Sequence, residues 1–339
     1  MDADEQALVS IILVTHNGST IVEECLDCLK SLRWSELEII IVDNASIDDT
    51  LLRVTRSLPT ATVVRLDKNR GYGAGCNEGA RVAKGEILLF MNQDVALSAG
   101  FLDGVVPMLI NDLRIGVCGG TVLSWDGTTL VSMGQVFDRW TGYGLDIGFG
   151  SSQVDPKQDI GEVFSPNGSA FAVRRIVFQE IGGFNESFFM YFDETDLSWR
   201  ARIAGFRVAC SRASVLRHMI TPQRAHGPWS RYYIDRNSLL SAVRNYQFSS
   251  LILFLPTSLA SRLAGIVLFT IFGRRELAHS TFRAVTDFIA SFPMAWRERS
   301  TSSRIRRASD REVMRREVLA TPSDILAVLS SSLMPHTRK

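Results

Sequence analysis

The chain has 339 residues, of which 46% are hydrophobic and 22% are charged, and its net charge is +1. These values are ordinary for a folded globular protein, and the length allows one large domain with an appendage or two domains. A near-neutral chain without any nucleic-acid-binding motif argues against nucleic acid as a partner.

The N-terminus and the cysteines favour a cytoplasmic protein. The first residues, Met1–Gln6, are acidic and lack the positive region of a secretory signal, so we expect none. Cys25 and Cys28 lie one helical turn apart, but a structural zinc site needs four ligands and no second pair of cysteines exists. We therefore expect reduced, buried thiols.

The first part of the chain alternates apolar strand-like runs with helical patterns. The expected strands are Leu8–Thr15, Glu38–Val42, Thr62–Leu66 and Ile87–Met91. The expected helices are Ser19–Leu32, Asp48–Arg56 and Gly73–Ala83. This alternation predicts an α/β fold with a mostly parallel central sheet and helices on both faces.

Polar side chains follow these strands, where ligands bind in such sheets. Asp43 ends the second strand, and a carboxylate there can accept the N3–H of uracil or thymine; the alternative is a helix-capping acid. After the fourth strand, Asp94 is a hard ligand for a divalent cation on a pyrophosphate, while Asn92 would contribute weakly or through water. His218 could add a nitrogen ligand and so favour Mn²⁺, although a lone histidine is more often structural.

The glycine-rich segment from Asn69 to Gly79 is not a dinucleotide fingerprint. Its glycines at 71, 73 and 75 do not fit G-x-G-x-x-G, and the segment follows the third strand rather than the first. It still suits a backbone that approaches a nucleotide or sugar at a helix N-terminus.

Beyond residue 120 the pattern becomes irregular. We interpret residues 124–166 as an extended loop or small sub-domain that lines a cleft. Regular elements return in the strand Gly168–Val173, the helix Arg175–Ile181, and the short strands Arg207–Cys210 and Ser214–His218.

Three acids, Asp193, Glu194 and Asp196, separate an aromatic run from a helical pattern. One reading is a general base beside an apolar cleft, because burying an unpaired carboxylate is costly or shifts its pKa. The other reading is first-turn helix chemistry, in which the acids are caps.

The C-terminal part changes character. Tyr232–Tyr246 is helical, and Ser250–Gly273 is apolar and long enough to span a bilayer, although Pro256 and Arg262 interrupt it. An interfacial amphipathic element and a buried pair of core helices both remain open. Between residues 296 and 317 lie eight arginines and four acids, which suits anionic lipid, an acidic partner or a solvated helix face.

Taken together, these motifs resemble family 2 glycosyltransferases with the GT-A fold, in the bacterial branch of rhamnosyltransferases and galactofuranosyltransferases. The resemblance covers about residues 8–245. We therefore expect a GT-A domain over 1–245 and, after it, a helical C-terminal region over 246–339 that could associate with a membrane. It rests on the motifs Val9–Asn17, Val42–Ser46, Asn69–Gly79, Leu89–Asp94 and, most specifically, Ile181–Arg200.

The resemblance implies a role for each matching residue. It implies nucleotide-sugar binding by Thr15, Asn17, Asp43, Asn77 and Asn92. Metal binding (Mn²⁺ or Mg²⁺) falls to Asp94, in the place of the family's D-x-D motif, and to His218. The catalytic base falls on Glu194, with Asp193 as its rival because the family's Glu-Asp pair is inverted here; the first Asp of D-x-D is Asn92, which puts direct metal binding at that position in doubt.

The implied reaction is an inverting transfer from a UDP- or dTDP-sugar, rhamnose or a hexose, to a hydroxyl of a polysaccharide or lipid-linked saccharide. Peripheral contact with the cytoplasmic face of the membrane would suit such an acceptor. Two alternatives remain. A sugar-phosphate nucleotidyltransferase would need a Gly-rich, Lys-containing phosphate loop after the first strand, which is missing; a non-catalytic nucleotide-sugar-binding protein would accommodate Asn92.

Overall fold

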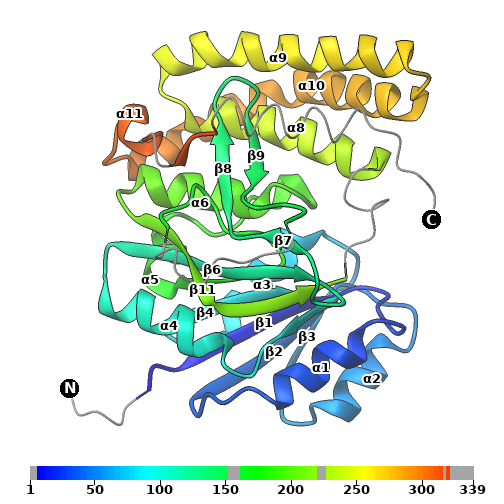
Figure 1. The fold of residues 1–339 in the computed structure, drawn as a ribbon, viewed down its shortest axis with the longest axis vertical. Helices are drawn as coiled ribbons and strands as arrows, with labels where there is room; N and C mark the ends of the chain where they lie inside the picture. Colours follow the sequence, from blue (N-terminus) through cyan, green and yellow to red (C-terminus); the bar gives the residue numbers. More distant parts are fainter. Residues whose placement is uncertain (1–5, 152–160, 220–226, 316–317, 321–339) are drawn as a thin grey trace.

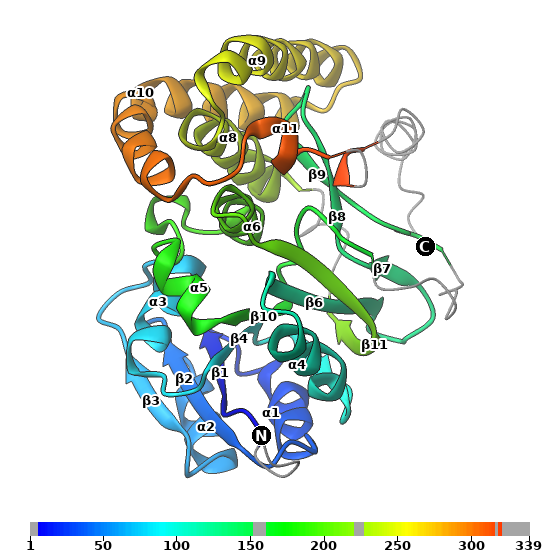
Figure 2. The ribbon, with the colours of Figure 1, turned by 90° about the vertical axis from the view of Figure 1, so that its left-hand side faces the viewer.

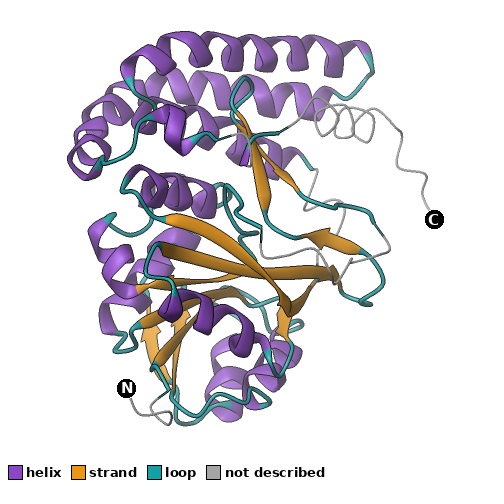
Figure 3. Ribbon diagram, turned by 60° about the vertical axis from the view of Figure 1, so that its left-hand side comes forward, coloured by secondary structure: helices purple, strands orange, loops and turns teal. Residues whose placement is uncertain are grey.

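The computed structural model describes residues 6–151, 161–219, 227–315 and 318–320. An α/β domain with a curved central sheet forms one end of the molecule, and a layer of long helices forms the other (Figure 1). Figure 3 shows the same division, with the large sheet in one half, the longest helices side by side in the other, and a two-stranded hairpin reaching from the first towards the second.

The central sheet is mixed. Its strands follow the order β3-β2-β1-β4-β10-β6-β11-β5, with β7 paired to β6. The strands are β1 (Val9–Thr15), β2 (Leu37–Asp43), β3 (Thr62–Arg65), β4 (Ile87–Asn92), β5 (Val95–Leu97), β6 (Ile115–Ser124), β7 (Leu130–Ser132), β10 (Ala170–Arg174) and β11 (Arg207–His218). The expected parallel pairing holds from β3 to β4 and between β6 and β11, whereas β10 runs antiparallel to both β4 and β6. No crossover helix joins β6 to β10 in the described chain, and parallel neighbours require such a connection.

Helices cover both faces of this sheet (Figure 2). Ile11 and Leu13 of β1 pack on one face with α1 (Val22–Lys30), α2 (Thr50–Ser57) and α4 (Phe101–Asn111). Ile12 and Val14 pack on the other with α3 (Tyr72–Val82), α5 (Arg175–Glu180) and α6 (Asp193–Ile203). Alternate side chains of a strand point to opposite faces, so a strand covered on both faces reads as a continuous apolar run.

Two irregular parts of the sequence take defined forms. Residues 124–166, expected as a loop or small sub-domain, contain β7 and a separate hairpin of β8 (Gln135–Asp138) and β9 (Tyr143–Asp146); residues 152–160 of this segment lie outside the described chain. The two short strands expected between 207 and 218 are one strand, β11, whose register shifts between Ser211 and Val215. The irregularity explains why the sequence pattern appears broken there.

The C-terminal part is helical, as expected. It comprises α8 (Pro228–Asn245), α9 (Phe248–Ile271), α10 (Arg275–Ile305) and the short α11 (Asp310–Val313); the remainder of the predicted 246–339 region, 316–317 and 321–339, lies outside the described chain. Although the predicted boundary follows residue 245, α8 packs with α9 and α10 in the same layer. Trp199 of α6, fully buried beside Tyr246 at a ring-centroid distance of 4.7 Å, joins this layer to the α/β domain.

All five cysteines are buried, and none pairs with another. This agrees with the expectation of free, buried thiols.

Candidate active site

Thr15 and Asp43 lie side by side at the carboxyl ends of β1 and β2. The two residues are in register, both are fully buried, and the backbone N–H of Asn44 donates to the carbonyl of Thr15 at 2.8 Å. Oγ1 of Thr15 is buried and has no hydrogen-bond partner within the described residues. A buried hydroxyl without a partner is costly, so a ligand atom that reached it would be bound favourably.

The Asp43 carboxylate is bonded within its own turn. It accepts from the backbone N–H of Ser46 at 3.2 Å and lies 3.6 Å from Nε of Arg65, whose side chain is 65% exposed. This bond closes a turn and caps no helix, because α2 begins at Thr50 with Asp49 at its N-cap. The helix-capping alternative considered for Asp43 is therefore wrong. A hollow opens beside it, lined by the residues that follow β2 and end β3: Ala45, Ser46, Ile47, Arg65, Leu66 and Asp67. A nucleobase bound in this hollow would contact Arg65, which lines it, and would reach the buried Asp43 carboxylate only after Arg65 moved aside.

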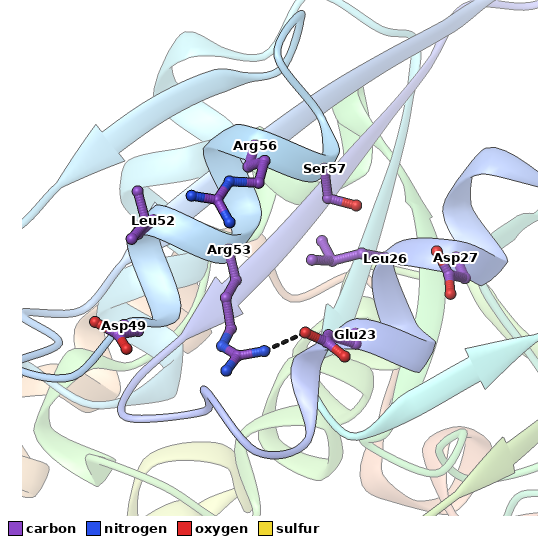
Figure 4. Close-up of a pocket in the computed structure, with 8 residues that line it drawn as sticks. All are labelled: Glu23, Leu26, Asp27, Asp49, Leu52, Arg53, Arg56 and Ser57. Carbon is purple, nitrogen blue, oxygen red and sulfur yellow. Dashed lines mark hydrogen bonds and ion pairs between the residues drawn. The ribbon is translucent and has the colours of Figure 1, made fainter.

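A second hollow lies away from every predicted site residue. Figure 4 shows it between α1 and α2, where Arg53 forms an ion pair with Glu23. Its lining is Glu23, Leu26, Asp27, Asp49, Leu52, Arg53, Arg56 and Ser57. Its position on the helix surface, away from the strand ends, separates it from the candidate site.

Asn17 and Asn77 both brace the backbone. Asn17 has φ of 45°, a left-handed conformation that asparagine tolerates, and its Oδ1 accepts from the N–H of Ile47 at 3.0 Å. Oδ1 of Asn77 accepts from the backbone N–H of Phe184 at 2.9 Å, and Nδ2 of Asn77 donates to the carbonyl of Phe184 at 3.0 Å. Asn77 thereby ties α3 to the segment before α6, and its oxygen and nitrogen are engaged by protein groups.

Gln93, for which the sequence motifs predicted no role, links the ends of β1 and β4. Its Oε1 accepts from the N–H of His16 and its Nε2 donates to the carbonyl of the same residue, both at 3.0 Å. These two hydrogen bonds hold the turn that carries Asn92 and Asp94. The backbone N–H of Asn92 donates to the carbonyl of Ser169 at 2.9 Å, which connects this turn to β10.

Asp94 and His218 meet beyond the strand ends. The antiparallel pairing of β5 with β11 sets Val95 opposite His218, and Oδ1 of Asp94 lies 3.2 Å from Nε2 of His218. Both side chains are slightly exposed, at 14% and 13%. The described residues contain no cluster of three or more candidate metal ligands, so these two would share a cation with ligand oxygens and water.

The donor set fits a hard divalent cation. One carboxylate and one imidazole reach the same point, and both retain access to solvent. Nδ1 of His218 is buried without a hydrogen-bond partner in the described chain, whereas Nε2 faces the carboxylate. An oxygen and a nitrogen ligand together suit Mn²⁺ as well as Mg²⁺.

The three acids of α6 have different environments. Asp196 is fully buried and accepts from Ser241 and Asn245 of α8; burial favours its neutral form, but Arg200 and Arg244 outweigh burial and hold its pKa at about 2. Asp196 therefore anchors α6 to the helical layer and is a poor candidate for a catalytic base.

Asp193 is enclosed, whereas Glu194 is only partly buried. Burial, with Glu194 and Asp196 nearby, raises the pKa of the Asp193 carboxyl well above its usual range. Oδ1 of Asp193 lacks a partner in the described chain and lies against Gly73, where an added Cβ would stand 2.8 Å away. An acid enclosed in this way is a poor candidate for a base that must reach an acceptor.

Glu194 lies against Gly168, where an added Cβ would stand 2.8 Å from Oε2. The next residue after Gly168 is Ser169, whose carbonyl accepts from the N–H of Asn92. The Glu194 carboxylate therefore lies beside the segment that holds the turn of Asn92 and Asp94. Burial, and secondarily the Asp146 carboxylate, raise the pKa of Glu194 to about 7. A carboxylate with this pKa can take up and release a proton near neutral pH.

The β8–β9 hairpin supplies polar neighbours of Glu194 that the sequence motifs did not identify. Oε1 of Gln135 accepts from Thr195 at 3.2 Å, and Asn167 donates to Asp146 at 3.3 Å. The only signal in the sequence was the Gly- and Tyr-rich composition of residues 124–166, which indicated a cleft lining but no particular residue.

A strained segment leads into α6. Phe189, Tyr191 and Phe192 have φ of 68°, 61° and 70°, which is unfavourable for aromatic residues. Nδ2 of Asn237 in α8 lies within 3.1 Å of the carbonyl oxygens of Phe188, Met190 and Tyr191. Strain of this kind persists where surrounding contacts fix it, and it concentrates at functional sites.

The chain is similar to known glycosyltransferases. The family model described as glycosyl transferase family 2 matches residues 10–182, just over half of the chain. The chain is 24% identical over 238 residues to an N-acetylglucosaminyl-diphospho-decaprenol L-rhamnosyltransferase of Mycobacterium tuberculosis, covering 62% of this chain and 76% of that protein. It is 26% identical over 216 residues to the O-antigen chain rhamnosyltransferase RfbN of Salmonella typhimurium, covering 62% and 66%.

Solved structures share the fold. The mannosyltransferase PcManGT of Pyrobaculum calidifontis, in complex with GDP-Man and Mn²⁺, superposes with a TM-score of 0.57 at 18% identity, covering 84% of this chain and 88% of that one. Residues 1–349 of S. aureus TarS in complex with UDP-GlcNAc give a TM-score of 0.57 at 16% identity, covering 88% and 89%. The fold is GT-A, and the chain belongs to glycosyltransferase family 2.

Proposed function

We propose that this glycosyltransferase performs an inverting transfer of rhamnose or a hexose from a UDP- or dTDP-sugar to a saccharide hydroxyl. The observation that carries the proposal is the position of Glu194: its carboxylate, with a pKa of about 7, lies against Gly168, next to the residue that bonds Asn92. Ionised Glu194 would take the proton of the acceptor hydroxyl as that oxygen attacks the anomeric carbon, and the nucleoside diphosphate would leave from the opposite side.

The donor would lie along the strand ends. The unpartnered Oγ1 of Thr15 and the hollow lined by Ser46 and Arg65 favour the nucleoside there, with Asp43 accepting the N3–H of uracil or thymine after Arg65 moves aside. Asn17 and Asn77, with their amides engaged by protein, would shape this site through the backbone they brace. Asn92 would stand beside the sugar or diphosphate rather than on the cation.

Asp94 and His218 would hold a divalent cation, which when bound supplies positive charge for the diphosphate leaving group. Mn²⁺ in the complex of PcManGT supports a divalent-cation requirement in this fold. We propose Mn²⁺ or Mg²⁺ as this ion.

The acceptor would be a lipid-linked saccharide or growing polysaccharide, met at the cytoplasmic face of a membrane. The similarity to a rhamnosyltransferase named for a decaprenol-linked substrate and to one named for the O-antigen chain supports this choice. Rhamnose as the donor sugar rests on the same two relatives.

The test is a panel of UDP-, dTDP-, GDP- and CMP-sugars, scored by thermal shift with and without Mn²⁺ and then by product formation on a prenyl-diphosphate-linked N-acetylglucosamine. The proposal expects a cation-dependent shift with UDP- or dTDP-sugars and a product of inverted anomeric configuration. Selective stabilisation by GDP- or CMP-sugars, or a product of retained configuration, would contradict it.

A further inference from the structure

Helix α9 has the reverse of the polarity expected for a surface helix. Its only charged residue along Phe248–Ile271 is Arg262, and that side chain is fully buried. Large apolar residues face outward instead, and only 22% of the most apolar 18-residue stretch of the helix is buried. Within the described residues, one side of α9 therefore joins the core, and its outward apolar face remains to be explained.

Buried polar contacts fix the rotation of α9 about its own axis. The Arg262 guanidinium donates to Oγ of Ser238 at 2.7 Å and stands over the ring of Tyr143 at 4.0 Å. One turn earlier, Oγ of Ser258 donates to the carbonyl of Thr141 at 2.6 Å. Since turning the helix would leave a buried guanidinium without these partners, the apolar face cannot rotate inward.

The outward residues form one continuous stripe. Ile252, Leu263, Val267 and Ile271 recur at helical spacing and are 60%, 55%, 57% and 70% exposed. On α10, which packs along α9, Phe282, Ile289 and Trp296 are also exposed and lie on one helical face. Figure 1 shows α9 running along the outer edge of the helical layer, at the end of the molecule opposite the β3–β2–β1 strands.

Basic residues border this apolar surface. Arg275, Arg297 and Arg304 of α10 are exposed. Of the three acids in α10, Asp287 accepts from Oη of Tyr232 at 2.5 Å and Glu298 pairs with Arg244 at 2.9 Å, which leaves Glu276 as the exposed one. The outward surface of the two helices is thus apolar with a net positive border.

We propose that this surface binds the face of an anionic lipid bilayer, with α9 lying in the plane of the interface and its stripe among the acyl chains. Apolar residues on one face, with arginines beside them for lipid phosphates, are the features of an interfacial helix. A spanning helix would have to remove Arg262 and Ser258 from their partners. A second copy of the chain would bring the same arginines towards one another.

This inference stands apart from the proposed glycosyl transfer, because no residue of the candidate active site carries it. The test is co-sedimentation of the full chain with vesicles of phosphatidylcholine and of phosphatidylcholine mixed with phosphatidylglycerol. We expect binding that is stronger on the anionic vesicles. The double variant Leu263→Glu/Val267→Glu should lower the partition coefficient at least about tenfold.

The matched control is Leu113→Glu/Ile176→Glu, which places two acids at apolar positions of slightly greater exposure (67% and 65%) on the α/β domain. It should leave vesicle binding unchanged, and unchanged circular dichroism and thermal unfolding would show that both variants fold. Arg275→Ala/Arg297→Ala should weaken binding to the anionic vesicles alone.

Three results would overturn the proposal. Equal vesicle binding by the wild type and the α9 variant would exclude the stripe as the lipid contact. A dimer in the absence of lipid, dissociated by the α9 variant, would identify a second copy as the occupant. Resistance of membrane-bound protein to alkaline carbonate extraction would indicate that α9 spans the bilayer.

Discussion

Oδ1 of Asp94 lies 3.2 Å from Nε2 of His218, although the first residue follows β4 and the second ends β11. The antiparallel pairing of the short β5 with the end of β11 produces this contact. The two side chains predicted separately as metal ligands thus meet at one point at the edge of the sheet.

Asp94→Ala should abolish cation-dependent binding of the donor. Removing the carboxylate takes away the hard ligand of the pair, so the affinity for UDP in the presence of Mn²⁺ should fall by at least about tenfold. Isothermal titration calorimetry with and without Mn²⁺ measures the effect. His218→Ala should show a smaller loss in the same assay, and an unchanged Mn²⁺ dependence in both variants would reject the site.

Glu194→Gln should bind the nucleotide sugar normally and lose turnover by roughly 10²- to 10⁴-fold, the usual contribution of a general base. Asp193→Asn is the comparison, because this acid is enclosed against Gly73 and should retain measurable turnover. Steady-state kinetics and donor titration on both variants distinguish the two. An inactive Asp193→Asn beside an active Glu194→Gln would move the base to Asp193.

The pH profile should report the raised pKa of Glu194. A base must be ionised, so kcat/KM should rise with pH and level off above about 7. Asp146 contributes to raising that pKa; Asp146→Asn should therefore move the acidic limb to lower pH without removing activity. A limb that stays in place in Asp146→Asn would contradict the assignment.

The same shift has a consequence for stability. The pKa of Glu194 is higher in the folded protein than in the unfolded chain, so the folded state binds more protons between pH 4.5 and about 7, and stability falls as pH rises through that window. Glu194→Gln should thus raise Tm at pH 8 relative to the wild type and have less effect at pH 4. Thermal unfolding at the two pH values measures the difference.

Asp196→Ala should destabilise the protein by about 3–5 kcal/mol, because it leaves Arg200 buried without its partner at 2.8 Å. Urea unfolding measures the change, and Asp103→Ala, at an exposed first-turn position of α4, should stay within about 0.5 kcal/mol of the wild type. The pKa of Asp196 is lowered, so its contribution is present above its ordinary value and is lost as pH falls towards 2.

Asn237→Ala should release the left-handed segment before α6. The variant leaves three backbone carbonyls without their shared donor, and we expect a loss of roughly 2 kcal/mol in stability together with a lower kcat. Donor affinity should change little, since the strand ends are untouched. A variant with wild-type kcat would show that the strained conformation has no part in turnover.

The N-terminal α/β alternation and the polar residues at the strand ends were evident from the amino-acid pattern. Buried parallel strands need continuous apolar runs such as Ile11–Val14, and a strand end is open to ligand, so both features are visible locally. The same holds for the acid-rich start of α6. Its motif, with those of the strand ends, was specific enough to indicate the family that the comparisons then showed.

Only the tertiary structure separated residues that look alike in the sequence. Asp193, Glu194 and Asp196 lie within four positions, yet Asp196 faces the arginines of α6 and α8, Asp193 faces Gly73, and Glu194 faces Gly168 and the hairpin. Their ionisation depends on what packs around each carboxylate from distant parts of the chain, which no local pattern encodes. The outward apolar stripe of α9 was decided in the same way, because the contacts of Arg262 with Ser238 and Tyr143 set which face of the helix the protein buries.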